Sequence, residues 1–157
     1  MNYRKIIDRL KDIYGLLMIF ALVMILVVLS TQVISRTFFN IAFVWVEEVA
    51  RYLFVWMVLG SAVLAYDKNL FVAVDIFSKF LSKKGKFIIE FIVRLIELFF
   101  FIWVFIASIR FMGFASGQMT PAMRIPISYI YLCFPIFFSL FSIIALAKVI
   151  SLIKRGP

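Results

Sequence analysis

The stretch FVWVEEVARYLFVWMVLGSAVLAYDKNLFVAVD, residues 43–75, contains the features that decide the fold. Trp45, Glu47 and Glu48 precede an apolar run in which only Arg51 is charged. On a helix, Arg51 follows the two glutamates by four and three residues, the spacings at which side chains meet. We expect both carboxylates to pair with the guanidinium, which avoids an unpaired charge at the rim of the hydrocarbon. The pattern therefore predicts a helix that enters a bilayer.

The composition of the whole chain supports a membrane protein. Of its 157 residues, 66% are hydrophobic and 20 are phenylalanine, and the mean hydropathy is +1.12. Soluble domains carry an apolar share of only about 45–50%. We predict an all-α integral membrane protein that forms a single membrane domain over residues 1–157. Four apolar runs predict transmembrane helices at residues 13–35, 49–66, 87–117 and 125–147.

Shorter signals fill the regions between these spans. Apolar residues recur at helical spacing among basic ones in residues 1–12 and 70–82, a pattern typical of amphipathic helices that lie in the interface. Asn40 is a candidate helix cap in the connection after the first span. Pro121 and Pro126 lack a backbone donor and predict a rigid turn before the last span. Pro135 predicts a kink inside that span.

Charged residues within the third span allow two interpretations. Glu90, Arg94 and Glu97 are spaced four and three apart along one stripe of the predicted helix. A lone carboxylate at this depth is a functional candidate, whereas three charges paired along the helix side are only structural. We favour the structural pairing, because the partners are already in the sequence. Gly113 and Gly117 form a small-xxx-small pair that predicts close packing of helices.

The distribution of basic residues predicts the orientation. With four spans, most of the 17 lysines and arginines fall on one side, at the two termini and in residues 68–86. The positive-inside rule then places both termini in the cytoplasm. Topology thus accounts for the net charge of +9, and we expect no nucleic-acid partner.

Histidine is absent and Cys133 is the only cysteine. The chain therefore lacks paired histidine ligands for haem and most residues that bind zinc. It cannot form an internal disulfide, and we interpret Cys133 as a small packing residue. We expect no cofactor, no metal site and no catalytic residues.

Two motifs carry a resemblance to a known family. The first is Trp45-x-Glu47-Glu48-x-Ala50-Arg51-Tyr52, followed by an apolar helix that ends near Asp75. The second is the turn Thr120-Pro121-Ala122-x-x-Ile125-Pro126, followed by Tyr129, Tyr131 and Pro135. In this order and topology, the chain resembles the small membrane subunit, the DctQ-like or Q subunit, of tripartite ATP-independent periplasmic (TRAP) transporters. The resemblance covers nearly the whole chain.

The resemblance implies a division of labour in the bacterial inner membrane. In this family, a periplasmic binding protein captures an organic anion such as sialic acid or a C4-dicarboxylate. A large multispan subunit moves the anion inward with sodium ions, which it binds itself. The small subunit, surrounded by membrane lipids, braces the large one.

Six residues are the candidates for this role. We expect them to fix where the helices enter the membrane and to contact the partner: Trp45, Glu47, Glu48, Arg51, Trp56 and Asp75. Plain anchoring at the membrane rim, without a partner, is the alternative interpretation. A self-assembling pore or small carrier, and an anchor subunit of another complex, remain rival functions.

Overall fold

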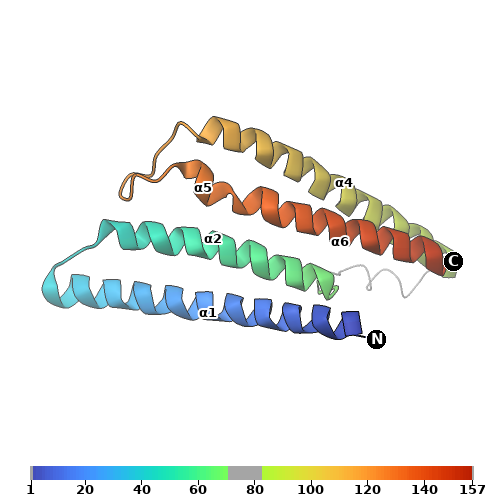
Figure 1. Ribbon diagram of the computed structural model, residues 1–157, viewed down its shortest axis with the longest axis horizontal. Coiled ribbons are helices and arrows are strands. Elements are labelled where there is room, and N and C mark those ends of the chain that lie inside the picture. Colours follow the sequence, from blue (N-terminus) through green and yellow to red (C-terminus); the bar gives the residue numbers. More distant parts are fainter. Residues whose placement is uncertain (1, 71–82, 157) are drawn as a thin grey trace.

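The computed structural model describes residues 2–70 and 83–156, and these residues are almost entirely helical (Figure 1). The helices are α1 (Asn2–Phe39), α2 (Val44–Asp67), α4 (Lys83–Ala115), α5 (Ile127–Tyr131) and α6 (Cys133–Arg155). Four segments are long and apolar enough to cross a membrane, namely α1, α2, α4 and the combined α5–α6 segment. The predicted all-α class with four spans is confirmed. The expected interfacial helix at 70–82, and Asp75 within it, lie outside the described residues apart from Leu70.

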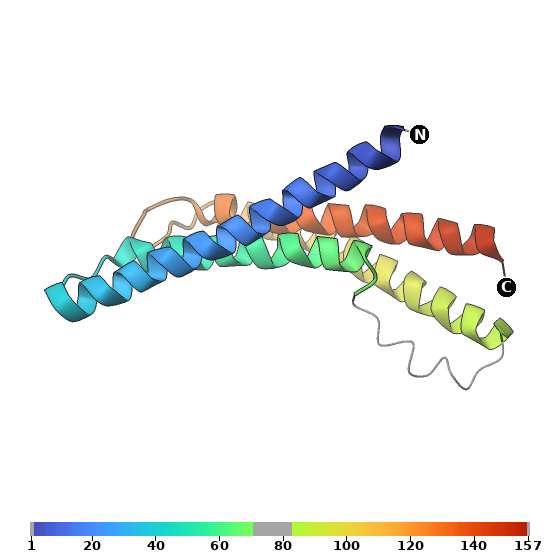
Figure 2. The same ribbon diagram turned by 90° about the horizontal axis from the view of Figure 1, so that it is seen from below.

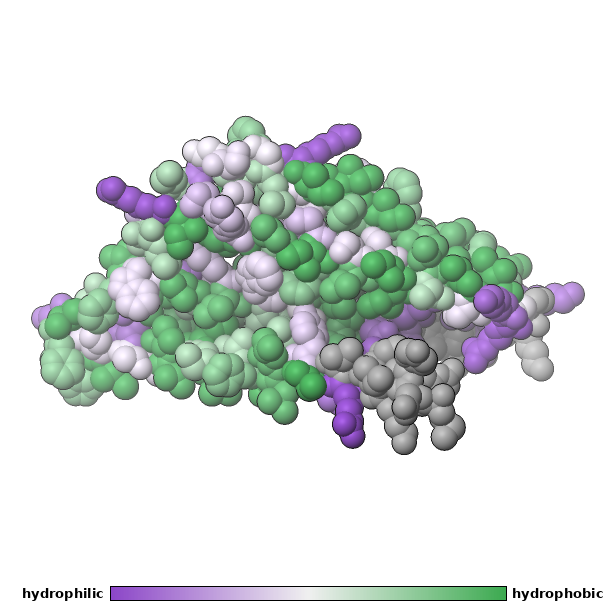
Figure 3. All heavy atoms as spheres, in the orientation of Figure 1, coloured by the Kyte–Doolittle hydropathy of each residue, from purple (hydrophilic) through white to green (hydrophobic). Residues whose placement is uncertain are grey.

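The two central helices, α2 and α6, hold the molecule together. The main helix contacts join α1 to α2, α2 to α6, and α6 to α4. In the most apolar window of each span, only 6% of residues are buried in α1 and in α4, against 22% in α2 and 28% in the α5–α6 segment. Hydrophobic side chains accordingly cover most of the face seen in Figure 3. This arrangement suits a solvent of hydrocarbon rather than water.

The molecule has two ends, which Figures 1 and 2 show. The loop end contains the connection between α1 and α2 and the connection between α4 and α5. The terminal end contains the start of α1, the end of α2, the start of α4 and the end of α6. The largest core cluster joins α2 to α6 through Val63, Tyr66, Cys133, Phe137 and other apolar residues. Cys133 is fully buried in this cluster, as expected for a packing residue.

The first helix differs from the sequence-based prediction. It runs without interruption from Asn2 to Phe39, so no break separates residues 1–12 from the first span. Asn40 does not cap the following helix, since the N-cap of α2 is Phe43. Asn40 instead has a positive φ of 55° directly after α1. Asparagine tolerates this left-handed conformation, which commonly ends a helix.

The last span is interrupted three residues before Pro135, the residue at which the sequence predicts a kink. Pro135 has no N–H to donate to the carbonyl of Tyr131, four residues earlier. The helix breaks at Leu132, between α5 and α6. The Ile136 N–H then donates to the Leu132 carbonyl at 3.4 Å, and the helix continues.

Close packing occurs at a different glycine from the pair predicted. A Cβ atom on Gly60 of α2 would lie 2.5 Å from the Tyr14 hydroxyl and 2.7 Å from the Met18 sulfur of α1. Gly113 and Gly117 have nothing within 4 Å of that position. Within the described residues no helix packs against this pair, since α4 ends at Ala115 and the two glycines do not share one helix face.

Candidate functional site

The connection between α4 and α5 forms a closed loop over residues 118–127. The Ile127 N–H donates to the Gln118 carbonyl at 2.9 Å, and the Thr120 N–H donates to the Ile125 carbonyl at 2.9 Å. The Thr120 hydroxyl accepts from the Ile125 N–H at 3.1 Å, and Thr120 is only 2% exposed. Pro121 lies inside this loop and Pro126, at its end, is the N-cap of α5. We call residues 118–127 the closed loop.

Glu48, in the first part of α2, binds the closed loop through its side chain. Its two carboxylate oxygens accept hydrogen bonds from the N–H groups of Ala122 at 2.9 Å and Met123 at 3.1 Å. Glu48 is 7% exposed, so these donors replace water around the buried charge. The two motifs noticed in the sequence are thus one structural unit.

The predicted pairing of Arg51 with both glutamates is wrong. Between the described residues, no ion pair joins Arg51 to Glu47 or Glu48. Arg51 and Glu47 are exposed instead. The physical reason is that Glu48 faces the closed loop, where two backbone donors satisfy its carboxylate in the protein interior.

Trp56 provides a second link between α2 and the last span. Its indole Nε1–H donates to the Ile130 carbonyl of α5 at 3.0 Å. Its ring meets Phe137 edge to face, with ring centroids 5.8 Å apart. Trp56 therefore serves an internal contact in this chain, eight residues along α2 from Glu48.

Trp45 lies at the surface of the loop end and is 50% exposed. Its ring centroid is 6.4 Å from that of Phe43. Both residues line a cleft of about 270 Å³ between α1 and α2. In this cleft, the amide of the buried Gln32 donates to the Phe43 carbonyl at 3.2 Å. Of the predicted site residues that the structure describes, Glu48 binds the loop that contains Pro121 and Pro126, and Trp56 binds α5 separately. Trp45, Glu47 and Arg51 take part in neither contact.

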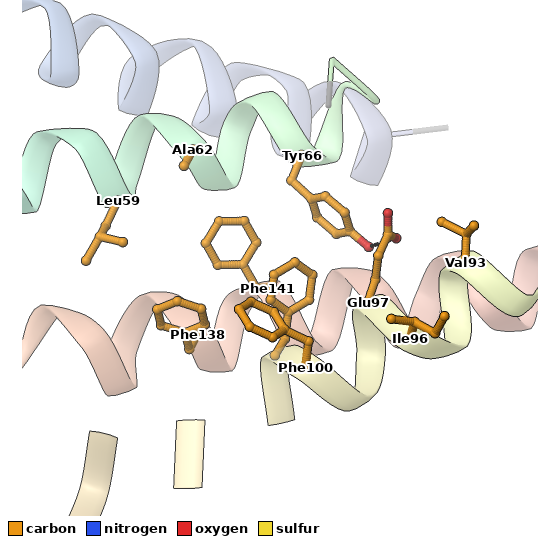
Figure 4. A pocket seen from close by; sticks show the side chains of 10 residues that line it. Leu59, Ala62, Tyr66, Val93, Ile96, Glu97, Phe100, Phe138 and Phe141 are labelled. Atoms are coloured by element: carbon orange, nitrogen blue, oxygen red, sulfur yellow. Dashed lines mark hydrogen bonds between the residues drawn. The ribbon is translucent and has the colours of Figure 1, made fainter. Parts of the chain in front are cut away.

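Three charged residues of α4 belong to a polar cluster at the terminal end. Arg94 lies 3.0 Å from the Glu97 carboxylate and 4.0 Å from that of Glu90. The Tyr66 hydroxyl of α2 donates to Glu97 at 2.7 Å, which Figure 4 shows. The pairing of Glu90, Arg94 and Glu97 expected from the sequence is present, and Tyr66 extends it to a second helix.

Lys148 of α6 completes this cluster. Its ammonium donates to the Tyr66 carbonyl and to the Asn69 side chain, the latter at 2.8 Å. It also lies 4.0 Å from the centroid of the Tyr66 ring, within the range of a cation–π interaction. We define the polar cluster as Tyr66, Asn69, Glu90, Arg94, Glu97 and Lys148.

Comparison with known proteins shows the family of this chain. The sequence profile of the family "Tripartite ATP-independent periplasmic transporters, DctQ component" matches residues 24–155, which include Glu48, the closed loop and the polar cluster. The chain belongs to the DctQ family. A Haemophilus influenzae (strain Rd) protein described as a TRAP transporter small permease is 39% identical over 80 residues. That match covers 51% of this chain and 48% of the relative, so it spans about half of each.

The described part of this DctQ component offers little material for binding a metal. Residues 2–70 and 83–156 contain no group of three or more His, Cys, Asp or Glu side chains placed to hold an ion. Glu48 and Glu97 each accept hydrogen bonds from other helices or loops. Their arrangement stabilises the contacts between elements of the fold.

The sequence alone does not predict several residues of the closed loop and of the polar cluster in this DctQ chain. The sequence predicts only that Thr120 belongs to a turn, whereas the structure shows that it is the most buried polar residue of the closed loop. Tyr66 lies in α2, Lys148 lies in α6, and Asn69 follows the end of α2, so only the folded chain brings these three residues next to α4. For Tyr66 and Asn69, the available signal was the polar run at the end of α2, because a polar side chain near the end of a span often bonds a neighbouring helix.

Proposed function

We propose that this DctQ component is the small membrane subunit of a TRAP-type secondary transporter and braces its large multispan subunit. The large subunit would bind the sodium ions and move an organic acid anion, of the sialic acid or C4-dicarboxylate type, delivered by a periplasmic binding protein. Membership of the DctQ family supports the transporter class. The bracing role, the substrate and the coupling ion are our proposal.

The observation that supports the bracing role is that polar side chains form hydrogen bonds inside the chain, whereas large apolar side chains are exposed on its outer faces. Glu48, Gln32 and Glu97 each form hydrogen bonds inside the chain. The outer faces of α1 and α4, by contrast, leave large apolar side chains uncovered. On α4, a single outward stripe contains Ile96, Phe99 and Trp103, which are 62%, 74% and 61% exposed. Such a surface fits packing against another membrane protein and leaves little polar lining for a solute path.

The orientation follows from the charge distribution. We place the multi-pass chain in the bacterial inner membrane with both termini in the cytoplasm. The closed loop and the connection between α1 and α2 would then face the periplasm, where the binding protein arrives. The basic residues at the terminal end are the ones that we place on the cytoplasmic side.

Reconstitution tests this proposal directly. The chain is purified with and without a large multispan TRAP subunit from the same organism, and each preparation is placed in vesicles with an inward sodium gradient. We expect the two chains to co-purify, and sodium-dependent uptake of an organic anion to need both chains plus the binding protein. Uptake by this chain alone would contradict the proposal and favour a self-assembling carrier or pore. Co-purification with a different enzyme complex would favour an anchor role.

A further inference from the structure

A polar cleft of about 300 Å³ lies at the terminal end, between the ends of α2, α4 and α6. Of the described residues that line it, three are cations, Arg94, Lys148 and Arg155, and one, Glu90, is a carboxylate. Lys148 and Arg155 lie seven residues apart on α6, which is about 10 Å along a helix. The cleft thus carries an excess of positive charge close to the end of a span.

Two of these cations lack an acidic partner among residues 2–70 and 83–156. Arg94 is engaged by Glu97 and Glu90. Among the described residues, neither Lys148 nor Arg155 forms an ion pair. The bonds of Lys148 to the Tyr66 carbonyl and to Asn69 hold its ammonium in place without neutralising it. An anion in the cleft would supply the missing charge.

An apolar cleft of about 560 Å³ lies deeper along the same three helices. Leu59 and Ala62 of α2, Ile96 and Phe100 of α4, and Phe138 of α6 line it, as Figure 4 shows. Tyr66 and Glu97 lie at its polar end, next to Arg94 and Lys148. The polar cleft is therefore followed, in the direction of the membrane interior, by an apolar one.

We propose that the two clefts together bind an anionic phospholipid, with its phosphate on Lys148 and Arg155 and an acyl chain in the apolar cleft. Basic pockets between transmembrane helices near the cytoplasmic surface recognise acidic lipid headgroups. The apolar cleft selects a lipid over a free anion, because a soluble phosphate would leave it unfilled. The net positive lining selects an acidic headgroup over one that carries its own ammonium. This site uses side chains of this chain alone and does not depend on the proposed transport function.

Native mass spectrometry of the full chain in detergent tests the site. The protein is incubated with phosphatidylglycerol or with phosphatidylethanolamine of identical acyl chains. We expect the wild type to retain phosphatidylglycerol preferentially, and the double variant Lys148→Gln/Arg155→Gln to lose about tenfold in its affinity. The matched control Lys84→Gln/Lys86→Gln removes two exposed charges from the same end without altering the cleft lining, and should retain the lipid.

Two further arms identify which part of the lipid is bound. Ala62→Phe places a ring in the apolar cleft and leaves every charge intact, so we expect it to weaken lipid retention as well. Excess inorganic phosphate should fail to displace the lipid. Equal retention of the two lipids by the wild type, equal losses in the charge variant and its control, or displacement by phosphate alone would each overturn the proposal.

Discussion

The loop end and the terminal end of this molecule hold their helices together by different chemistry. At the loop end, one buried carboxylate, Glu48, binds two backbone N–H groups of the closed loop. At the terminal end, several partly exposed ion pairs connect the helices or stabilise one of them, including Arg94 with Glu97 and Lys11 with Asp67. Removing one partner of a buried charge is costly, whereas a partly exposed ion pair contributes little. The loop end therefore relies on one buried charge, Glu48, beside the neutral hydrogen bonds of Gln32 and Trp56, whereas the terminal end distributes its charges over several pairs.

The largest effect should come from removing Glu48. Glu48→Ala removes a charged acceptor that takes two hydrogen bonds, from the partly exposed N–H groups of Ala122 and Met123, and we expect a loss of about 2–5 kcal/mol in the free energy of unfolding. Limited proteolysis should cut the closed loop faster in this variant, and its thermal unfolding in detergent should begin earlier. Glu47→Ala is the matched control, since Glu47 is exposed and should change stability by less than about 0.5 kcal/mol. Equal effects of the two substitutions would remove the contrast between the ends.

A substitution midway between the two ends sharpens the comparison. Gly60→Leu would push against Tyr14 and Met18 of α1, and we expect a cost of about 1–3 kcal/mol from overpacking. Cysteine cross-linking between α1 and α2, together with the unfolding temperature, measures the effect. Gly113→Leu adds the same side chain where nothing lies within 4 Å, so it should fold normally. Similar destabilisation in both would show that helix propensity, rather than contact, determines the result.

Loss of a single hydroxyl tests the redundancy of the polar cluster. Tyr66→Phe removes the hydrogen bond to Glu97 but leaves Arg94 in place beside that carboxylate. We expect a loss of about 1–2 kcal/mol, smaller than that of Glu48→Ala. The unfolding temperature provides the measurement, with Tyr129→Phe at an exposed position as control. A loss as large as that of Glu48→Ala would show that the terminal end also depends on one group.

The smallest effect is expected at the ion pair between α1 and α2. Lys11 and Asp67 lie 2.6 Å apart, but their side chains are 37% and 26% exposed. Lys11→Met should cost less than about 1 kcal/mol. Repeating the measurement at about 0.5 M salt should reduce the difference further, because screening weakens exposed pairs. A difference that persists unchanged at high salt would point to packing of the lysine stem instead.

Local signals predicted the helices well and their contacts poorly. The four spans follow from apolar runs that are visible in the sequence, and the break before α6 follows from Pro135, whose missing N–H acts on its own helix. Both depend on neighbours within a few residues. The partners of Glu48 are 74 and 75 residues away, so helical spacing favoured Arg51 as a partner when the folded chain offered better ones.

The glycines and Asn40 show the same limit. Gly113 and Gly117 have the spacing of a packing motif, but α4 ends between them. Gly60 does not belong to that motif, yet it makes the tight contact with α1. Whether a small residue meets a neighbour depends on the arrangement of whole helices. Likewise, Asn40 is compatible with either side of a turn, and only the backbone conformation assigns it to the end of α1.

The distance in sequence between Glu48 and the closed loop has a consequence for biogenesis. A ribosome makes the chain from its N-terminus, so the hairpin of α1 and α2 is complete long before residues 122 and 123 are translated. Until those residues arrive, the Glu48 carboxylate has to stay hydrated at the membrane surface, because no backbone donor is yet available to it. Seating of this side chain therefore marks the final stage of insertion. A chain truncated before the closed loop would leave this carboxylate without its two backbone donors.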